Sequence, residues 1–367
     1  MEQATWPSAP SGGVFSLSQY PDQTHRVDAL EADMQLFELA EALGYDTAWL
    51  AEHLFSTYGI ATSIQVIAAS VLQRVKRMRI GSAVCVIPFN HPLRTAADYA
   101  LIDCLSRGRL NFGIGRAYQP HEFVGLGIEM SDSREMFNEG IELILKSWTQ
   151  EKFTHKGKFW EVPDEIELLP KPAQEPHPPI YQATISPESF DQAAKNGWSL
   201  QLAAPFSYRT YREEWIPKLA DEIKRYEDAP VKHGHDPARL ERMILLPYYV
   251  DTNAVRAREI LKPHVEWFYN KVASHQQPGK GGPVKGYELT MSEGAKSRQM
   301  GYLAFDKLAE FDACVVGTPQ ECVDKISRMK EAFGLTEVVI WPNLGGMLST
   351  RAENSVRLTW DEVVPHV

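Results

Sequence analysis

The chain has 367 residues, of which 44% are hydrophobic and 23% charged, and its formal net charge is −10. Acidic and basic residues are interspersed, so no basic face indicates a nucleic-acid or anionic-membrane partner. The sequence contains no apolar run as long as a membrane span, no signal-peptide pattern and no Cys-x-x-Cys pair, so we expect a cytoplasmic protein with reduced thiols.

Short apolar runs alternate with amphipathic stretches through the first half of the chain. Apolar runs without polar alternation are typical of strands buried on both faces, and recurrence every three to four residues is typical of helices. We expect strands at 13–19, 47–52, 79–88 and 109–115. We expect helices at 28–44, 61–74, 92–106 and 133–149.

The second half of the chain continues this alternation after a short interruption. Residues 153–162 have β character around a His-Lys-Gly turn, which predicts a small excursion outside the main sheet. Further strands are expected at 180–184, 198–204, 243–250 and 337–342. Further helices are expected at 187–196, 207–228, 253–273 and 318–334.

Eight buried strands separated by helices predict an α/β fold, a (β/α)8 TIM barrel that forms a single domain over residues 1–367. The competing architecture is an open dinucleotide-binding sheet, which calls for Gly-x-Gly-x-x-Gly directly after its first strand. The sequence GIGRAY at 113–118 follows the fourth strand and holds only the first two of these glycines. The barrel is therefore the predicted fold.

One long segment, at about 275–301, interrupts the alternation of strands and helices. It is rich in Gly and Lys and poor in aliphatic residues, so we expect a loop inserted into the barrel. Two interpretations stay open. The segment is either a disordered surface insert without a function or a lid over the active site, since long loops in compact domains often serve as lids.

Polar side chains occur where several of the predicted strands end. Glu52 and His53 close the second strand, Arg116 follows the fourth and Ser186 follows the fifth. Catalytic groups of such barrels lie at the carboxyl ends of the strands, so these side chains should meet at one mouth. His53 can carry a proton near neutral pH, and the permanent charge of Arg116 suits a phosphate or carboxylate.

Several stretches carry a resemblance to a known family: GYDTAWLAEHLF, the segment from IGSAVCVIPFNHP to GRAYQPHEF, SDSREMF, PPIYQATIS and VVGTPQEC. In order and spacing they resemble the bacterial luciferase-like family of flavin-dependent monooxygenases, which includes the luciferase α subunit. The resemblance implies a barrel that binds reduced FMN (FMNH2), reacts it with O2 to a C4a-peroxyflavin and oxygenates a small organic substrate. A separate flavin reductase would supply the reduced FMN, since the chain has no NAD(P)H fingerprint.

The resemblance also implies roles for individual residues. His53 matches the family's active-site histidine, which acts in acid–base catalysis and supports the peroxyflavin, and Glu52 would orient it. Ala83 and Val84 match a dipeptide beneath the isoalloxazine ring that is joined by a cis peptide bond in the family. The implied contacts to the flavin and its phosphate come from Arg116, Tyr118, Arg134, Ser186 and Ser189.

The sequence departs from luciferase at positions around the expected flavin. Gly115 stands where luciferase has a reactive cysteine, and Leu54 replaces a second histidine. Ile185 replaces a glutamate, and the pair Ala203–Ala204 replaces Ser–Trp. These departures are compatible with phosphate binding, but they argue against light emission and against specificity for long-chain aldehydes.

Two alternatives to an FMN-dependent monooxygenase stay open on the same fold. One is an oxidoreductase that uses the deazaflavin F420 for hydride transfer, and the other is a non-catalytic flavin-binding subunit. The sequence has no metal-binding motif, so no metal is expected. Family members commonly pair through barrel helices, so the resemblance implies a homodimer or a heterodimer.

Overall fold

The apolar runs form parallel strands that are buried along nearly their whole length in the computed structural model, which describes residues 11–21, 26–275 and 284–367. Each strand pairs with its neighbour, and the pairings of β12 with β1 and of β9 with β10 close the sheet into an eight-stranded barrel. The barrel strands are β1 (Ser11–Ser16), β2 (Thr47–Leu50), β3 (Arg79–Ser82), β5 (Leu110–Gly115), β8 (Ile180–Ala183), β9 (Ser199–Ala203), β10 (Arg242–Val250) and β12 (Glu337–Trp341). The predicted TIM barrel is confirmed.

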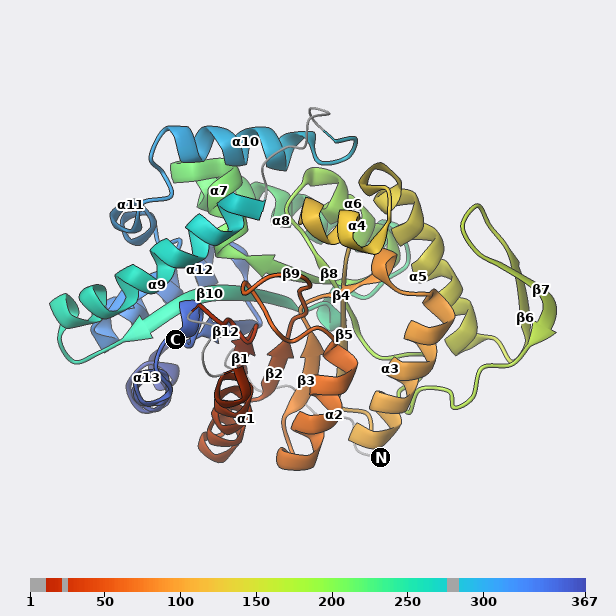
Figure 1. Ribbon diagram of the computed structural model, residues 1–367, viewed down its shortest axis with the longest axis horizontal. Helices are drawn as coiled ribbons and strands as arrows, with labels where there is room; N and C mark the ends of the chain where they lie inside the picture. Colours follow the sequence, from red (N-terminus) through yellow and green to blue (C-terminus); the bar gives the residue numbers. More distant parts are fainter. Residues whose placement is uncertain (1–10, 22–25, 276–283) are drawn as a thin grey trace.

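Long helices surround this barrel (Figure 1). They are α1 (Arg26–Leu43), α2 (Ile64–Arg74), α3 (Pro92–Ser106), α5 (Ser133–Thr149), α6 (Pro187–Asn196), α8 (Trp215–Lys232), α9 (Ala254–His275), α12 (Pro319–Phe333) and α13 (Ser349–Glu362). Local signals fix many of their ends. The side chains of Thr318 and Glu321 form a capping box at the start of α12, and Gly334 ends this helix with a φ of +57°. No helix in the described ranges has the length and apolar character that would be needed to cross a membrane.

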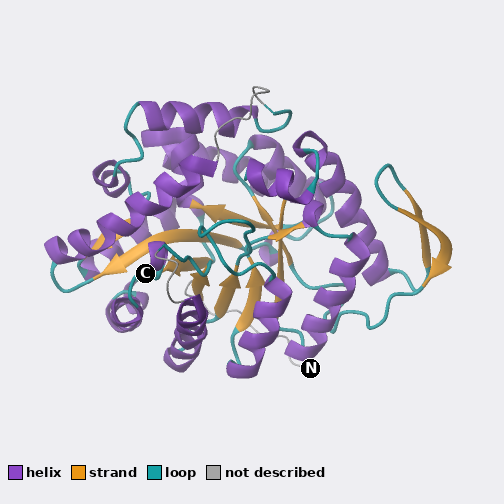
Figure 2. Ribbon diagram, in the orientation of Figure 1, coloured by secondary structure: helices purple, strands orange, loops and turns teal. Residues whose placement is uncertain are grey.

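Shorter strands lie outside the barrel. β4 (Cys85–Val86) pairs with β5, and β11 (Val315–Gly317) pairs with β10. The predicted excursion forms the antiparallel hairpin of β6 (Phe153–Lys156) and β7 (Glu161–Ile166), which projects away from the helices in Figure 2. Because this hairpin lies apart from the barrel mouth, it takes no part in the candidate site.

Four further α-helices are α4 (Pro120–Leu126), α7 (Ala204–Tyr211), α10 (Glu288–Gln299) and α11 (Phe305–Glu310). In Figure 1, α4, α6, α7 and α10 gather on the side of the barrel to which β2 and β3 point. This side holds the carboxyl ends of the strands, where the sequence predicts the active site.

Two predicted elements are wrong in their extent. The single strand expected at 79–88 is divided into β3 and β4, which are separated by Ala83 and Val84. The single helix expected at 207–228 is two helices, α7 and α8, with a sharp turn at Arg212, whose φ is +56°. The break suits Pro217, because a residue without a backbone N–H sacrifices no helix hydrogen bond in the first turn of α8.

The expected loop at 275–301 is also wrong in part. Residues 276–283 lie outside the described residues, but 288–299 form the helix α10. The helix has no strong apolar stripe, and its position depends on contacts with α7, such as the hydrogen bond from Ser297 Oγ to the carbonyl oxygen of Arg209 (2.7 Å). Tertiary packing therefore stabilises a helix that the local sequence pattern does not indicate.

The four cysteines are free thiols, as expected. Cys85, Cys314 and Cys322 are buried, whereas Cys104 is only partly buried and its Sγ donates a hydrogen bond to the carbonyl oxygen of Lys171 (3.3 Å). The prediction that Cys104 is a buried thiol is therefore only partly correct, because its helix α3 lies on the outer layer of the barrel.

Candidate active site

The carboxyl ends of the barrel strands surround a cavity of about 280 Å³. Its walls also hold residues that the sequence did not assign to a site, above all Glu122, Arg209 and Tyr287. The residues that the sequence did assign all line this cavity: Glu52, His53, Ala83, Val84, Arg116, Tyr118, Arg134, Ser186 and Ser189. The fold therefore brings every predicted site residue to one place.

The imidazole of His53 is held by a buried carboxylate from α4. Nδ1 of His53 lies 2.8 Å from Oε1 of Glu122, which is only 2% exposed, and the same oxygen accepts the backbone N–H of Leu54 (2.8 Å). A carboxylate oxygen can only accept, so Nδ1 carries the proton of this hydrogen bond. In the neutral ring, Nε2 is then the nitrogen that can accept a proton in the cavity.

No hydrogen bond joins Glu52 to His53 in the described part of the chain, although an orienting role was expected. Its Oε2 accepts the backbone N–H of Ile64 at the start of α2 (3.2 Å), and its Oε1 accepts that of Val86 (3.4 Å). Burial raises the pKa of Glu52 to about 7, against the lowering effect of these two hydrogen bonds. Glu52 thus connects α2 to the segment after the Ala83–Val84 bond, and Glu122 is the residue that holds the histidine.

Glu122 was not predicted as a site residue, because the short helix that carries it was not predicted. Local signals for α4 are nevertheless present, since Pro120 occupies its first turn and Gly127 ends it with a φ of +69°. Proline at the start and glycine just after the end are typical of a helix. They could have indicated α4, but not the contact between Glu122 and a residue 69 positions earlier.

Two tyrosines cover the other nitrogen of His53. The hydroxyl of Tyr118 lies 3.5 Å from Nε2 of His53 and 2.9 Å from the hydroxyl of Tyr58. The ring of Tyr58 packs edge-on against the imidazole, with 4.6 Å between the ring centroids. Burial raises the pKa of both tyrosines, so their hydroxyls stay protonated and can only exchange hydrogen bonds near neutral pH.

The peptide bond between Ala83 and Val84 is cis, as the resemblance implies. Just before it, Ser82 Oγ accepts the N–H of Gly113 (2.9 Å) and donates to its carbonyl oxygen (2.7 Å), which fastens β3 to β5. The side chain of Val84 then lies against Gly115, where an added Cβ would be 2.5 Å from Val84 Cγ2. A cysteine at position 115 would therefore collide with Val84.

Two arginines form one end of the cavity. The backbone of Gly286 lies between them, because a Cβ added there would be 3.3 Å from Nη1 of Arg116 and 3.5 Å from Nε of Arg134. Nη2 of Arg116 donates to the carbonyl oxygen of Gly286 (3.2 Å), but the buried Nη1 has no hydrogen-bond partner among the described residues. Burial lowers the pKa of Arg116, so a bound anion would compensate the lost solvation of its charge.

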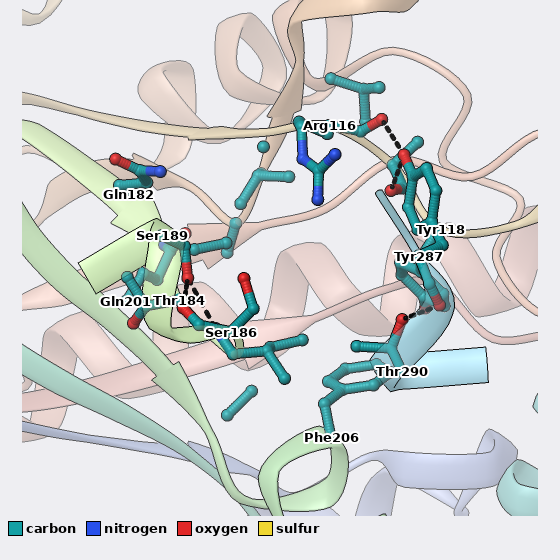
Figure 3. A pocket seen from close by; sticks show the side chains of 18 of the residues that line it. Arg116, Tyr118, Gln182, Thr184, Ser186, Ser189, Gln201, Phe206, Tyr287 and Thr290 are labelled. Atoms are coloured by element: carbon teal, nitrogen blue, oxygen red, sulfur yellow. Dashed lines mark hydrogen bonds between the residues drawn. The ribbon is translucent and has the colours of Figure 1, made fainter. Parts of the chain in front are cut away.

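The amino end of α6 faces the same arginines. Ser186 is its N-cap residue, and Figure 3 shows Ser186 and Arg116 on neighbouring walls of the pocket. The Ser186 hydroxyl, the backbone amide of Glu188 and the two arginines lower the pKa of the Glu188 carboxyl, so an anion is stabilised here. The hydroxyl of Ser189 is engaged in the same turn, where it donates to the Ser186 carbonyl oxygen (2.6 Å) and accepts the N–H of Ile185 (3.1 Å).

The described part of the insert lies over the cavity. Residues 286–291 line it, and the ring of Tyr287 lies 4.8 Å from Cζ of Arg116. The Tyr287 hydroxyl donates to the carbonyl oxygen of Ala117 (3.0 Å) and forms a hydrogen bond with Ser133 (2.9 Å). The position of 286–291 agrees with a lid and disagrees with a remote surface insert.

Buried polar side chains line the cavity on β8, directly after β8 and on β9. Thr184 Oγ1, Gln182 Oε1 and Gln201 Oε1 have no hydrogen-bond partner among the described residues, and all three side chains line the cavity (Figure 3). Buried polar groups are normally paired, so these atoms are available to a polar ligand or to water. Among the described residues, no three His, Cys, Asp or Glu side chains converge to hold a metal ion.

The sequence profile of one family, described as luciferase-like monooxygenase, matches residues 11–337. The chain belongs to this family. A relative within it, the alkanal monooxygenase alpha chain of the Kryptophanaron alfredi symbiont, is 25% identical over 361 residues, or 97% of this chain and 98% of the relative. The alkanal monooxygenase alpha chain of Photorhabdus luminescens is 26% identical over 362 residues, or 96% of each chain. The chain thus spans nearly the full length of these family members.

Solved structures give the same fold. Monooxygenase RslO1 from Streptomyces bottropensis superposes with a TM-score of 0.81 at 25% identity, over 97% of this chain and 99% of that one. The oxygenating constituent of 3,6-diketocamphane monooxygenase from Pseudomonas putida, solved in complex with FMN, has a TM-score of 0.75 at 18% identity, over 98% and 99%. The coenzyme F420-dependent tetrahydromethanopterin reductase of Methanopyrus kandleri has a TM-score of 0.70 at 18% identity, over 98% and 99%. The fold is therefore shared by proteins that use either flavin.

Proposed function

We propose that this chain is the oxygenating component of a two-component monooxygenase, which receives reduced FMN from a separate reductase and oxygenates a small organic molecule without emitting light. The observation that carries the proposal is the cationic end of the cavity, beside Arg134 and the amino end of α6, where the buried Nη1 of Arg116 has no partner in the part of the chain that the structure describes. A phosphate monoester fits this chemistry, because guanidinium groups and helix amino ends both stabilise a dianion.

The residues of the cavity fit the rest of FMN. Arg116, Arg134 and Ser186 would hold its phosphate, and the apolar Ala83 and Val84 would lie against its ring. The oxygens of Gln182, Thr184 and Gln201, which have no partner within residues 11–21, 26–275 and 284–367, are available to its polar edge. Reduced FMN would supply the electrons that activate O2.

His53 is the residue that we assign to proton transfer. Its Nε2 faces the cavity, and Glu122 holds the proton on Nδ1, so the ring can exchange a proton only through Nε2. Tyr118 keeps this nitrogen in place through its hydroxyl, and Tyr58 supports Tyr118. The aromatic side chains around these groups exclude water, which strengthens each polar contact.

The proposal also covers the cellular location of the protein and its partners. A reductase that delivers reduced flavin works beside the oxygenase, so we place the protein in the cytoplasm, where its free thiols also stay reduced. We further propose that it pairs as a homodimer or heterodimer, by analogy with its family.

The first experiment is anaerobic titration of the purified chain with reduced FMN and, separately, with reduced F420. We expect reduced FMN to bind more tightly, and Arg116→Met to weaken its binding roughly tenfold to a hundredfold, as the loss of a charge-assisted hydrogen bond predicts. The exposed arginine Arg94, on the outer helix α3, gives the matched control Arg94→Met, which should leave binding unchanged.

Exposure of the FMN complex to O2 then tests the chemistry. The protein should delay the return of oxidised-flavin absorbance compared with free reduced FMN, and a substrate should shorten the delay. Tighter binding of F420 would contradict the monooxygenase and favour an F420-dependent oxidoreductase. Reoxidation of bound FMN at the rate of free FMN would also contradict it and would favour a non-catalytic flavin-binding subunit.

A further inference from the structure

The cavity is also lined by a buried arginine that the proposed phosphate site does not use. Arg209, on α7, is only 7% exposed and lines the cavity. Its guanidinium carbon lies 5.9 Å from the ring centroid of Phe206, on the same helix. A buried cation beside aromatic rings at the wall of a cavity is a strong determinant of which molecules can bind there.

Arg209 belongs to the half of the cavity that contains His53. The ring of Phe206, which neighbours the guanidinium, also packs against Tyr118, and the Tyr118 hydroxyl lies 3.5 Å from Nε2 of His53. The rings of Tyr118 and Phe206 pack edge-on, with 5.1 Å between their centroids. Aromatic rings, one cation and the proton-transfer group thus share one compartment.

The helix α10 packs against Arg209 and holds it in position. Ser297 Oγ donates to its carbonyl oxygen (2.7 Å), and a Cβ added at Gly294 would lie only 3.1 Å from its Nε. A side chain at position 294 would therefore push against the guanidinium. This arrangement differs from that of Arg116 and Arg134, which flank Gly286 at the other end of the described insert.

Burial lowers the pKa of Arg209, since the charge has lost much of its solvation. A ligand anion in contact with the guanidinium restores part of the lost solvation through charge-assisted hydrogen bonds. The neighbouring rings of Phe206 and Tyr118 offer flat apolar surfaces, which suit an aromatic body. The charge of Arg209 and the flat apolar surfaces beside it therefore both favour a ligand that joins an anionic group to an aromatic ring.

We propose that Arg209 binds an ionised oxygen, a carboxylate or a phenolate, on a substrate with a flat and mostly apolar ring, and holds that ring beside His53. The inference rests on the proposed function in one respect, since it takes this half of the cavity as the substrate side of the flavin. Arg209 is then a specificity-determining residue, and neutral analogues of the substrate bind weakly.

The test measures binding of matched probes to the full chain without flavin, by titration calorimetry at neutral pH. The first pair is naphthoate and its neutral amide, and the second is dinitrophenolate and its methyl ether. We expect each anion to bind roughly tenfold to thirtyfold more tightly than its neutral partner, as a charge-assisted hydrogen bond predicts. Preference in the first pair alone assigns the carboxylate, and preference in the second pair alone assigns the phenolate.

Three variants locate the preference. Arg209→Met, of similar length but uncharged, should bring anion and neutral partner to within about twofold, while Arg209→Lys should keep part of the preference. Arg212→Met is the matched control, because Arg212 contacts α10 through a salt bridge to Glu293 (3.0 Å) rather than facing the cavity. It loosens the same helix contact, but it should keep the preference.

Arg134→Met distinguishes this site from the phosphate end of the cavity. If this variant, and not Arg209→Met, abolishes the preference, the anion binds at the phosphate site and the inference is wrong. Equal binding of anion and neutral partner to the unaltered chain also overturns it. Neither result affects the proposed function, whose test is the binding and reoxidation of reduced FMN.

Discussion

At the scale of single residues, the position of the His53 imidazole depends on Glu122. The carboxylate holds Nδ1 of His53 and the backbone N–H of Leu54 with one oxygen, at 2.8 Å each. Both the orientation of the ring and the position of its proton follow from this contact, because the partner of one ring nitrogen decides which nitrogen carries the proton. Glu52, although adjacent to His53 in sequence, accepts hydrogen bonds from backbone amides instead.

We expect Glu122→Gln to weaken the preference of His53 for a proton on Nδ1, because a neutral amide attracts that N–H less strongly than a carboxylate. Nitrogen NMR of the imidazole ring measures the population of each form. The same variant should shorten the delay in reoxidation of bound reduced FMN by about tenfold or more, in line with the usual contribution of a positioned acid–base group.

Glu52→Gln is the matched control for this prediction, since the partners of Glu52 are the backbone amides of Ile64 and Val86. It should leave the distribution of the proton on His53 unchanged. A change in the Glu52 variant together with none in the Glu122 variant would reverse the two assignments made from the structure.

At the scale of elements, the insert has the largest consequence. Its residues 286–291 form a wall of the cavity, and α10 supports Arg209 on α7. The insert is tied to the barrel loop after β5 by the hydroxyl of Tyr287, which bonds to Ala117 and Ser133. The buried hydroxyl of Tyr287 therefore connects the insert, which covers the cavity, to the strand end that carries Arg116.

Removal of this hydroxyl in Tyr287→Phe should make the insert open more often. The lost hydrogen bonds are worth about 1 kcal/mol each, so amide hydrogen exchange in α10 should accelerate roughly fivefold or more. Tyr302→Phe is a suitable comparison, because its hydroxyl donates to Glu213 (3.1 Å) in an exposed contact and its loss should change exchange much less. Equal exchange rates in Tyr287→Phe and the unaltered protein would show that the hydroxyl does not tie the insert down.

At the scale of the whole molecule, closure of the barrel buries a carboxyl group. Glu337, at the start of β12, is 1% exposed and accepts the indole N–H of Trp49 (2.9 Å) on β2. Burial raises its pKa from the usual 4.5 to about 8, against the lowering effect of the Trp49 hydrogen bond. The closed barrel therefore holds Glu337 in its protonated form near neutral pH.

The raised pKa makes stability depend on pH. Below about pH 4.5, Glu337 is protonated in both states, and between about 4.5 and 8 only the unfolded chain loses the proton. The free energy of unfolding therefore falls as the pH rises through this window, by about 1.4 kcal/mol for each unit of pKa difference, and it levels off above the folded pKa. Glu52, with its pKa raised to about 7, acts in the same direction.

We expect Glu337→Gln to be more stable than the unaltered protein above about pH 8 and to show a shallower fall in stability between about pH 4.5 and 8. The amide oxygen can still accept the Trp49 N–H, but the side chain does not ionise. Urea denaturation at a series of pH values measures both effects. A constant difference between the two proteins at all pH values would mean that folding does not shift the pKa of Glu337.

The sequence alone determined most of the elements of this molecule. The expected helices at 92–106, 133–149 and 187–196 coincide with α3, α5 and α6, and all eight expected strands occur in the barrel. These elements are local, because burial periodicity, a proline in the first turn and a glycine after the last residue are all written within a few positions. The strand ends also showed where Glu52, His53, Arg116 and Ser186 would meet.

Only the tertiary structure decided which of these side chains hold one another. The carboxylate that holds His53 comes from a residue 69 positions later, and α10 forms where α7 offers it a surface. Neither contact produces a periodic pattern in the sequence, since a single side-chain contact between distant residues does not alter the local pattern around them. The sequence thus determined the barrel and the residues at its mouth, and tertiary packing determined the pairing of His53 with Glu122, the wall formed by the insert and the position of Arg209.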